Sequence, residues 1–261
     1  MTGYGLKDKV VLITGGGSGI GLATATAFAE QGARVAVADR NPAAAAAIAG
    51  DHAVDTTELD VTADGAIAGW VDAVADRLGG VDVLVNNVGL APFRESFLSV
   101  TDEDWRSLLD VNFFAAVRAS RAAIPHMIER GGGAIVSLAS DAATQPDPFF
   151  VDYAVSKAAV LSLSKSLSME FGPRGIRSNC VAPGPTATPA MDSFISSLST
   201  ELGKGFEETK EYFAKDMRKL PLGRMNDPAD VAAVIVFLAS DLARQVTGAS
   251  YRVDAGSHVY L

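Results

Sequence analysis

Cysteine and histidine are scarce in this sequence. Cys180 is the single cysteine among 261 residues, which excludes a disulfide within one chain and a zinc site built from thiolates. The histidines, His52, His126 and His258, are far apart, and none belongs to an HExxH or His-x-His pattern. We therefore expect a functional site that works without a metal ion.

Positive charge and long apolar runs are also in short supply. The chain has 22 Lys and Arg against 31 Asp and Glu, a formal net charge of −9. Nucleic acids and anionic membranes both attract clustered basic residues, so neither partner is expected. The apolar run that follows Lys7 and Lys9 covers only 10–13, too short for a signal peptide, and no later run reaches the length of a membrane span. These features predict a soluble, cytoplasmic protein.

The sequence does contain short apolar runs that alternate with helical patterns. The expected strands are 10–14, 34–39, a weak one at 53–59, 81–86, 134–139, 176–182 and 249–253. The expected helices are 20–31, 42–49, 63–78, 101–130, 152–172, 190–219 and 227–240. Continuous apolar strands separated by helices indicate a parallel sheet covered on both faces. We predict one α/β domain over 1–261, a doubly wound Rossmann-type fold with a seven-stranded parallel sheet.

One segment, 186–220, interrupts this alternation, because it is helical and charged and has no strand of its own. We expect it to form a lid over the substrate.

The glycine-rich stretch TGGGSGIG, residues 14–21, follows an expected strand and opens a helix. Its glycines, Gly15, Gly19 and Gly21, depart from the literal GxGxxG spacing. In this context glycines let the backbone approach a pyrophosphate, and the start of the helix directs amide groups at it. No Lys-Ser/Thr pair follows, so the stretch is not a Walker A loop.

Asp39 ends the second expected strand. A carboxylate there can accept hydrogen bonds from an adenosine ribose and would repel a 2′-phosphate, which favours NAD over NADP. Because Asn41 and Pro42 follow, Asp39 is equally interpretable as the cap of the next helix. Arg40 could pair with a 2′-phosphate, whereas the glycine-rich stretch contains no basic residue. We predict NAD as the cofactor, with NADP as the less favoured alternative.

Tyr153 and Lys157 have i, i+4 spacing in an expected helix, so they share one face. They are interpretable as two amphipathic side chains at the edge of the core, or as a proton donor with the cation that tunes it. Tyrosine ordinarily has a pKa of about 10, and a nearby ammonium group would lower it.

The Ser-x-x-Lys pattern of Ser/Lys hydrolases also occurs, at 162–165, but no partner motif accompanies it. Cys180 lies in an expected strand, which favours a place in the core.

Several motifs occur in a characteristic order: TGGGSGIG, NNVG at 86–89, Asn112, Ser140, YAVSK at 153–157 and APGPTATP at 182–189. With these motifs the chain resembles the classical short-chain dehydrogenase/reductase family from about residue 6 to the C-terminal stretch TGASYRVDAG. The resemblance implies hydride transfer between a nicotinamide cofactor and an alcohol or ketone. Departures from the family pattern are Val88, where alanine is usual, and the acidic stretch 141–150.

The resemblance assigns residues to catalysis and to cofactor binding. The catalytic set is Asn112, Ser140, Tyr153 and Lys157. The cofactor set is Gly15, Ser18, Gly19, Ile20, Gly21, Asp39, Asp60, Val61, Asn87, Gly89, Tyr153, Lys157, Pro183, Gly184, Thr186 and Thr188. Within it, Asp60 and Val61 would hold the adenine, and the last four residues would lie beside the nicotinamide. Asn87 and Gly89 would steady the sheet and touch the cofactor ribose.

In this scheme Tyr153 moves the proton, and Lys157 tunes it and binds the nicotinamide ribose. Ser140 would hold the substrate oxygen. Asn112 would hold a water in line with Lys157, a role that rests on the resemblance. We expect an NAD(H)-dependent oxidoreductase that acts on a secondary alcohol or its ketone. The alternatives are an NADP(H)-dependent ketone or 3-oxoacyl-type reductase, and a regulatory nucleotide-binding protein without turnover.

Substrate specificity is expected from 90–97, 141–150 and 186–220. Their large apolar residues, which suggest a pocket for a neutral or hydrophobic alcohol, are Phe93, Phe149, Phe150, Met191 and Phe194. The resemblance further implies a homotetramer, with 101–130 and 152–172 as interface elements.

Overall fold

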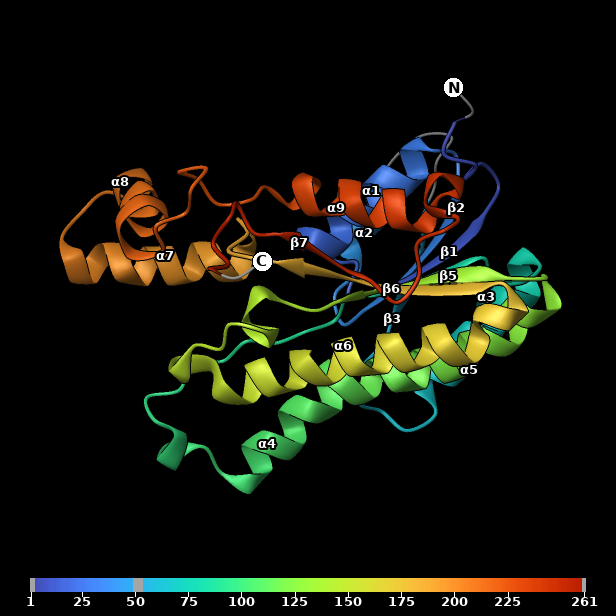
Figure 1. Ribbon diagram of the computed structural model, residues 1–261, viewed down its shortest axis with the longest axis horizontal. Coiled ribbons are helices and arrows are strands. Elements are labelled where there is room, and N and C mark those ends of the chain that lie inside the picture. The colour runs from blue at the N-terminus through green and yellow to red at the C-terminus, as the bar shows by residue number, and fades with distance from the viewer. Residues whose placement is uncertain (1–2, 49–53, 260–261) are drawn as a thin grey trace.

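The centre of the molecule is one parallel sheet with helices on both faces (Figure 1). The structure is a computed structural model that describes residues 3–48 and 54–259. The seven described strands are β1 (Val10–Thr14), β2 (Arg34–Asp39), β3 (Asp55–Glu58), β4 (Val83–Asn86), β5 (Gly133–Leu138), β6 (Ile176–Pro183) and β7 (Ser250–Val253). Their order is β3-β2-β1-β4-β5-β6-β7, and every neighbouring pair is parallel. The prediction of a doubly wound, seven-stranded Rossmann-type fold is confirmed.

The described helices are α1 (Gly19–Glu30), α2 (Ala43–Ala46), α3 (Ala66–Leu78), α4 (Asp102–Leu109), α5 (Ala115–Glu129), α6 (Val151–Phe171), α7 (Pro189–Leu202), α8 (Phe206–Tyr212) and α9 (Pro228–Ala239). Helix α2 is shorter than the expected 42–49. Residue 49, and residue 53 of the expected weak strand, lie outside the described residues. None of the helices in the described part of the chain is both long and apolar enough to cross a membrane.

The alternation of side chains along β1 explains how both faces of the sheet become covered. Val11 and Ile13 pack against Phe28 of α1 and Ile235 of α9. The intervening strand residues point to the opposite face and join a cluster with α3 and α5. Each fully buried Val, Leu or Ile side chain contributes about 1.5–3 kcal/mol to folding. An apolar run without polar alternation therefore belongs in the middle of the sheet.

The expected continuous helix over 101–130 is wrong at its centre, because a π-helical turn over Asp110–Phe114 separates α4 from α5. The wide turn presents Asn112 to the loop that follows β4. Asn112 Oδ1 accepts from the Leu90 amide at 2.8 Å, and Nδ2 donates to the Leu90 carbonyl at 2.9 Å and to Ser156 Oγ at 3.0 Å. These long-range contacts favour the local widening, a feature that often marks functional sites.

The segment 186–220 extends beyond the sheet at the left of Figure 1. It is not the single helical stretch 190–219 that the sequence predicts. Gly203, with φ +63°, ends α7, and α8 continues into a π-helical turn over Phe213–Met217. Its apolar residues around Ile195, Phe213 and Leu220 form one cluster with Met225 and Ala255. The segment therefore packs against the stretch that follows β7 at the carboxyl edge of the sheet.

Candidate active site

The glycine-rich turn lies between β1 and α1 and is shaped by close backbone contacts. Gly15 has φ +71° and Gly19 φ +51°, a region that L side chains rarely adopt. A Cβ atom added to Gly21 would lie 2.0 Å from the carbonyl oxygen of Gly15, so no larger residue fits there. Ser18 precedes α1 without making a side-chain capping bond, which leaves the first amides of this helix available. The turn therefore offers a cradle that fits a pyrophosphate group.

Asp39 is tied to this turn by its side chain. Its Oδ2 accepts from the Gly17 amide at 2.9 Å, and its Oδ1 accepts from the Asn41 amide at 2.8 Å. It does not cap α2, whose N-cap residue is Pro42. Asp39 thus places a carboxylate beside the glycine cradle, at the position where the sequence predicts a ribose contact.

Asp60 and Val61, the two residues expected to hold the adenine, lie one strand further along the sheet edge, after β3. Asp60 accepts from the amide of Thr62 at 2.8 Å and from its hydroxyl at 2.7 Å. These hydrogen bonds, led by the one from the hydroxyl, lower the pKa of Asp60. Val61 is buried against the cluster that contains Trp70.

Asn87 joins the end of β4 to the glycine-rich turn. Its Nδ2 donates to the Gly15 carbonyl at 2.7 Å and to the Thr14 carbonyl at 3.2 Å. Val88 contributes to the same contact, because its Cγ2 would lie 2.9 Å from a Cβ on Gly15. The valine that departs from the family pattern therefore fills space against the cradle.

The loop that follows β6 closes the other side. A Cβ on Gly19 would lie 3.0 Å from Thr188 Cγ2, so this loop touches the glycine-rich turn directly. Thr188 Oγ1 accepts from the Met191 amide at 3.4 Å and caps α7, while Thr186 Oγ1 donates to the Gly184 carbonyl at 2.9 Å. Pro183 ends β6. The predicted nicotinamide loop and the predicted pyrophosphate turn thus lie together at one edge of the sheet.

The four expected catalytic residues come from three elements at this edge. Ser140 follows β5, and Tyr153 and Lys157 lie on α6, with the Lys157 ammonium 5.9 Å from the centroid of the Tyr153 ring. Lys157 Nζ donates to the Leu138 carbonyl at 2.7 Å. A Cβ on Gly89 would lie 3.1 Å from Lys157 Nζ and 3.7 Å from Asn112 Oδ1, so this glycine lies beside both side chains. The arrangement can hold an oxygen-bearing substrate beside a cradle for a dinucleotide.

Comparisons with known proteins support the same conclusion. A family model described as "Enoyl-(Acyl carrier protein) reductase" matches residues 15–258. The human protein "Dehydrogenase/reductase SDR family member 4" is 37% identical over 97% of this chain and 88% of its own. The chain belongs to the short-chain dehydrogenase/reductase family. It is accordingly an oxidoreductase of this type, whose fold binds a nicotinamide cofactor.

Two other members of the family are similar over nearly their whole length. L-rhamnose 1-dehydrogenase (NAD(P)(+)) of Azotobacter vinelandii is 40% identical, covering 98% of this chain and 99% of that one. The crystal structure of L-sorbose reductase from Gluconobacter frateurii, complexed with NADPH and L-sorbose, superposes with a TM-score of 0.94 at 33% identity and full coverage of both chains. The names of these two relatives include both cofactors, so they leave the choice between NAD and NADP open.

The titration of the Tyr153–Lys157 pair differs from the prediction. Burial raises the pKa of Tyr153, the charge of Asp141 raises it further, and a hydrogen bond with Ser140 lowers it. Burial lowers the pKa of Lys157 to about 8. Burial therefore dominates the pKa of Tyr153, and it acts in the opposite direction to the lowering by Lys157 that the sequence predicts.

The other reactive candidates are not part of this site. Cys180 is buried beneath α6, and burial raises the pKa of its thiol to about 11, so it is a core residue. Ser162 and Lys165 of the Ser-x-x-Lys pattern are exposed on α6. Among residues 3–48 and 54–259, no group of three or more His, Cys, Asp or Glu side chains is arranged to hold a metal ion.

The residues expected to form an apolar pocket divide into two groups. Phe93 stacks on Phe149 at 5.1 Å between ring centroids, and Phe150 meets the edge of Tyr153 at 6.5 Å. Met191 and Phe194 instead pack within the cluster of segment 186–220. Only the first group therefore adjoins Tyr153.

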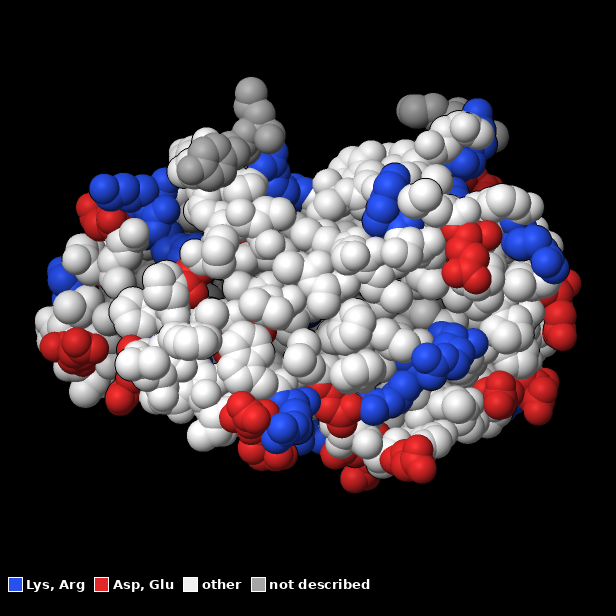
Figure 2. Space-filling model, turned by 60° about the horizontal axis from the view of Figure 1, so that its bottom comes forward, with Lys and Arg blue, Asp and Glu red and all other residues white. Residues whose placement is uncertain are grey.

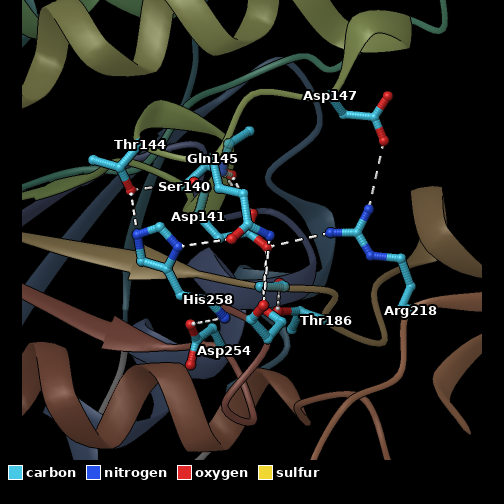
Figure 3. A network of polar contacts seen from close by, with 12 residues as sticks. Ser140, Asp141, Thr144, Gln145, Asp147, Thr186, Arg218, Asp254 and His258 are labelled. Atoms are coloured by element: carbon cyan, nitrogen blue, oxygen red, sulfur yellow. Dashed lines mark hydrogen bonds and ion pairs between the residues drawn. The ribbon is translucent and has the colours of Figure 1, made fainter. Parts of the chain in front are cut away.

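A polar network that the sequence analysis missed lies near Ser140. It joins the acidic stretch 141–150 to Arg218 and to the tail after β7 (Figure 3). Gln145 Oε1 and Nδ1 of His258 are 2.9 Å apart, and Arg218 Nη2 lies 3.4 Å from Asp141 Oδ2. These partners are far apart in the sequence, so no local pattern could have indicated them.

Proposed function

We propose that the chain is an NAD(H)-dependent dehydrogenase or ketone reductase whose substrate is a neutral secondary alcohol that carries further hydroxyl groups. The observation that carries this proposal is the position of Tyr153, Ser140 and Lys157 beside the glycine cradle. The network around Asp141 offers polar partners for additional hydroxyl groups. On the face that Figure 2 shows, mixed charges surround a largely uncharged middle.

The cofactor would be held by residues that leave room for it. The glycine-rich turn would bind the pyrophosphate, and Asp39 would accept from the adenosine ribose. Ile20 at the start of α1 and Gly89 at the end of β4 would border it. When bound, a nicotinamide supplies the carbon that accepts or gives the hydride.

The chain's own residues would handle the proton and the substrate oxygen. Ser140 would donate to that oxygen while its negative charge develops. Tyr153 would take the hydroxyl proton in oxidation and return it in reduction. Lys157 would supply positive charge beside the Tyr153 ring, where the phenolate forms. Asn112 would hold a water that connects Lys157 to solvent.

The proposal also covers the oligomeric state and the segment expected to close over the substrate. Val155 and Met169 on α6 and Phe114 beside α5 are exposed apolar side chains on the elements where the family resemblance expects an interface. We propose a homotetramer that covers them. The segment 186–220 would act as the substrate lid, since its Arg218 contacts Asp141 beside Ser140.

A substrate panel tests the proposed activity. Polyols and their ketoses, simple secondary alcohols and 3-oxoacyl thioesters would each be assayed with NAD(H) and with NADP(H). We expect turnover of the polyol–ketose group with the highest kcat/KM in the presence of NAD(H). Cofactor binding without turnover of any member would contradict the proposal, and a clear preference for 3-oxoacyl thioesters would replace the substrate class.

Asp39→Ala should reduce discrimination against NADP. The variant removes the charge that would repel a 2′-phosphate and two hydrogen bonds to backbone amides. Because a hydrogen bond to a charged group contributes about 1.5–3 kcal/mol, we expect kcat/KM for NAD to fall about tenfold or more while that for NADP falls less or rises. Steady-state kinetics with both cofactors measures the ratio.

Asp39→Asn is the matched control, since it keeps an amide oxygen for Gly17 but loses the charge. It should shift the cofactor ratio while it preserves more of the total activity than Asp39→Ala. A wild-type preference for NADP would show that the interpretation of Asp39 is wrong.

A further inference from the structure

Asp141 is a buried carboxylate next to Ser140 that the proposed mechanism does not use. Ser140 Oγ donates to Asp141 Oδ1 at 3.0 Å. The amide of Ala142 donates to Ser140 Oγ at 3.2 Å and to Asp141 Oδ1 at 2.8 Å. The other carboxylate oxygen, Oδ2, accepts from Arg218 and from Ser257, each at 3.4 Å. Figure 3 shows Asp141 between Ser140 and Arg218.

The hydroxyl of Ser140 has one proton and two acceptors that compete for it. One acceptor is Asp141 Oδ1, and the other is the Tyr153 oxygen, whose hydrogen bond with Ser140 lowers the pKa of the phenol. A serine hydroxyl can donate only one hydrogen bond. While Ser140 donates to Asp141, it can only accept from Tyr153 or from a substrate hydroxyl. It then gives no support to a phenolate or to a substrate oxygen that gains negative charge.

Arg218 determines how strongly Asp141 attracts this proton. It follows the π-helical turn at the end of α8, and it also pairs with Asp147 at 3.6 Å. A guanidinium group on Oδ2 offsets the negative charge of the carboxylate. The segment 186–220 thereby reaches Ser140 through two successive contacts, Arg218 to Asp141 and Asp141 to Ser140, and Ser140 is the hydrogen-bond partner of Tyr153.

The charged and titratable groups around this chain of contacts are few. Two charged groups face Tyr153. Asp141 approaches it from the loop after β5, and Lys157 lies near it on the same helix, α6. The preceding residue, Asp152, is fully buried and paired with Arg94 at 2.7 Å, with Asp104 on the same guanidinium at 2.9 Å.

The tail after β7 packs against the same loop. His258 is bonded to Gln145 and Thr144, and its backbone amide donates to Asp254 at 3.2 Å. In the described part of the chain, the Asp141 carboxylate accepts hydrogen bonds from Ser140, Ala142, Arg218 and Ser257.

We propose that Asp141 is a positioning residue that acts through Ser140, and that Arg218 relieves its hold on the serine proton when the substrate segment is seated. This inference rests on the proposed function, since Ser140 and Tyr153 are the groups it controls. It also assigns the stretch 141–150, which the family resemblance leaves without a role, to the coupling of the segment with proton transfer.

The test compares Asp141→Asn with Arg218→Gln in the pH dependence of kcat/KM for alcohol oxidation. Activity should rise with pH as Tyr153 loses its proton. Asp141→Asn removes a negative charge and a competing acceptor, so the rise should move to lower pH by about half a unit to one unit. Arg218→Gln leaves the carboxylate unopposed, so the rise should move to higher pH by a similar amount.

Arg224→Gln is the matched control, because Arg224 pairs with Asp230 on the exposed side of the same C-terminal region. It should leave the profile unchanged. In the Asp141→Asn background, Arg218→Gln should lose most of its effect, as two residues that act through one group are not additive. A purely structural pair would move both profiles in the same direction or neither, and either result overturns the proposal.

A second readout separates this inference from the proposed function. Tyrosine labelled with ¹³C at Cζ, assigned with Tyr153→Phe, reports the phenolate fraction of Tyr153 at one fixed alkaline pH at which all variants keep their native circular dichroism. The fraction should rise in Asp141→Asn and fall in Arg218→Gln. These shifts in an enzyme without turnover would overturn the function and keep the inference. Turnover of the substrate without these shifts in the phenolate fraction would keep the proposed function and overturn the inference.

Discussion

Tyr153→Phe is expected to reduce kcat by about a thousandfold or more, in line with the 10²–10⁴-fold contributions of general acid–base groups. The substitution removes the hydroxyl that exchanges the proton with the substrate. It keeps the ring, whose edge meets Phe150 and whose face lies 5.9 Å from the Lys157 ammonium. Cofactor affinity should therefore change little. Steady-state kinetics at saturating cofactor and a fluorescence titration of NADH measure the two quantities.

Tyr251→Phe provides the control for loss of a phenol elsewhere. Tyr251 lies on β7 with its ring against Phe237, on the face of the sheet that α9 covers. Its hydroxyl is remote from the proposed chemistry, so kcat should stay within about twofold of wild type, as for a substitution away from special features. Turnover that survives Tyr153→Phe, or equal losses in the two variants, would show that Tyr153 is not the acid–base group.

The fold was largely predictable because its signals are local. VVLIT in β1 is apolar without alternation, and such a run is stable only when both of its faces are covered. The i, i+4 spacing of Tyr153 and Lys157 likewise needs nothing beyond the geometry of a helix. For the same reason, the elements that meet at the carboxyl edge could be assigned to one site before the structure was known.

The differences from the sequence analysis arise from contacts between distant parts of the chain. The π-helical turn around Asn112 lies inside a pattern that favours a continuous helix, and it is accompanied by a pair of hydrogen bonds to Leu90. Arg218 is 77 positions from Asp141, so neither residue indicates the other. The raised pKa of Tyr153 depends on burial, which spacing alone does not reveal.

Lys157→Met is expected to reduce kcat/KM by about a hundredfold or more and, at neutral pH, to stabilise the enzyme. The loss of activity follows from removal of the positive charge beside the Tyr153 ring. The gain in stability follows from burial. Lys157 is 4% exposed, and desolvation lowers its pKa from 10.5 to about 8. A folded state that binds a proton less tightly than the unfolded state loses stability wherever the unfolded lysine is protonated.

The pH dependence of this gain has a defined sign. Below pH 8 the full penalty of the buried ammonium is present, and it disappears as the pH rises through the window between about 8 and 10.5. Methionine avoids the penalty but leaves the Leu138 carbonyl without its donor, which offsets part of the gain. We expect a net increase of about 1–2 kcal/mol in the free energy of unfolding at neutral pH, shrinking toward the alkaline end. Urea denaturation at several pH values measures it.

Lys165→Met is the matched control, because Lys165 lies two turns further along α6 and is exposed. It should change neither turnover nor the pH dependence of stability. A functional group that is held at a cost to the fold is typical of active sites, since activity and stability select for different residues there. If Lys157→Met instead lowers stability at neutral pH, the ammonium is a structural ion and the tuning of Tyr153 must come from elsewhere. If the variant keeps its turnover, Lys157 has no part in the chemistry, and α6 contributes Tyr153 alone.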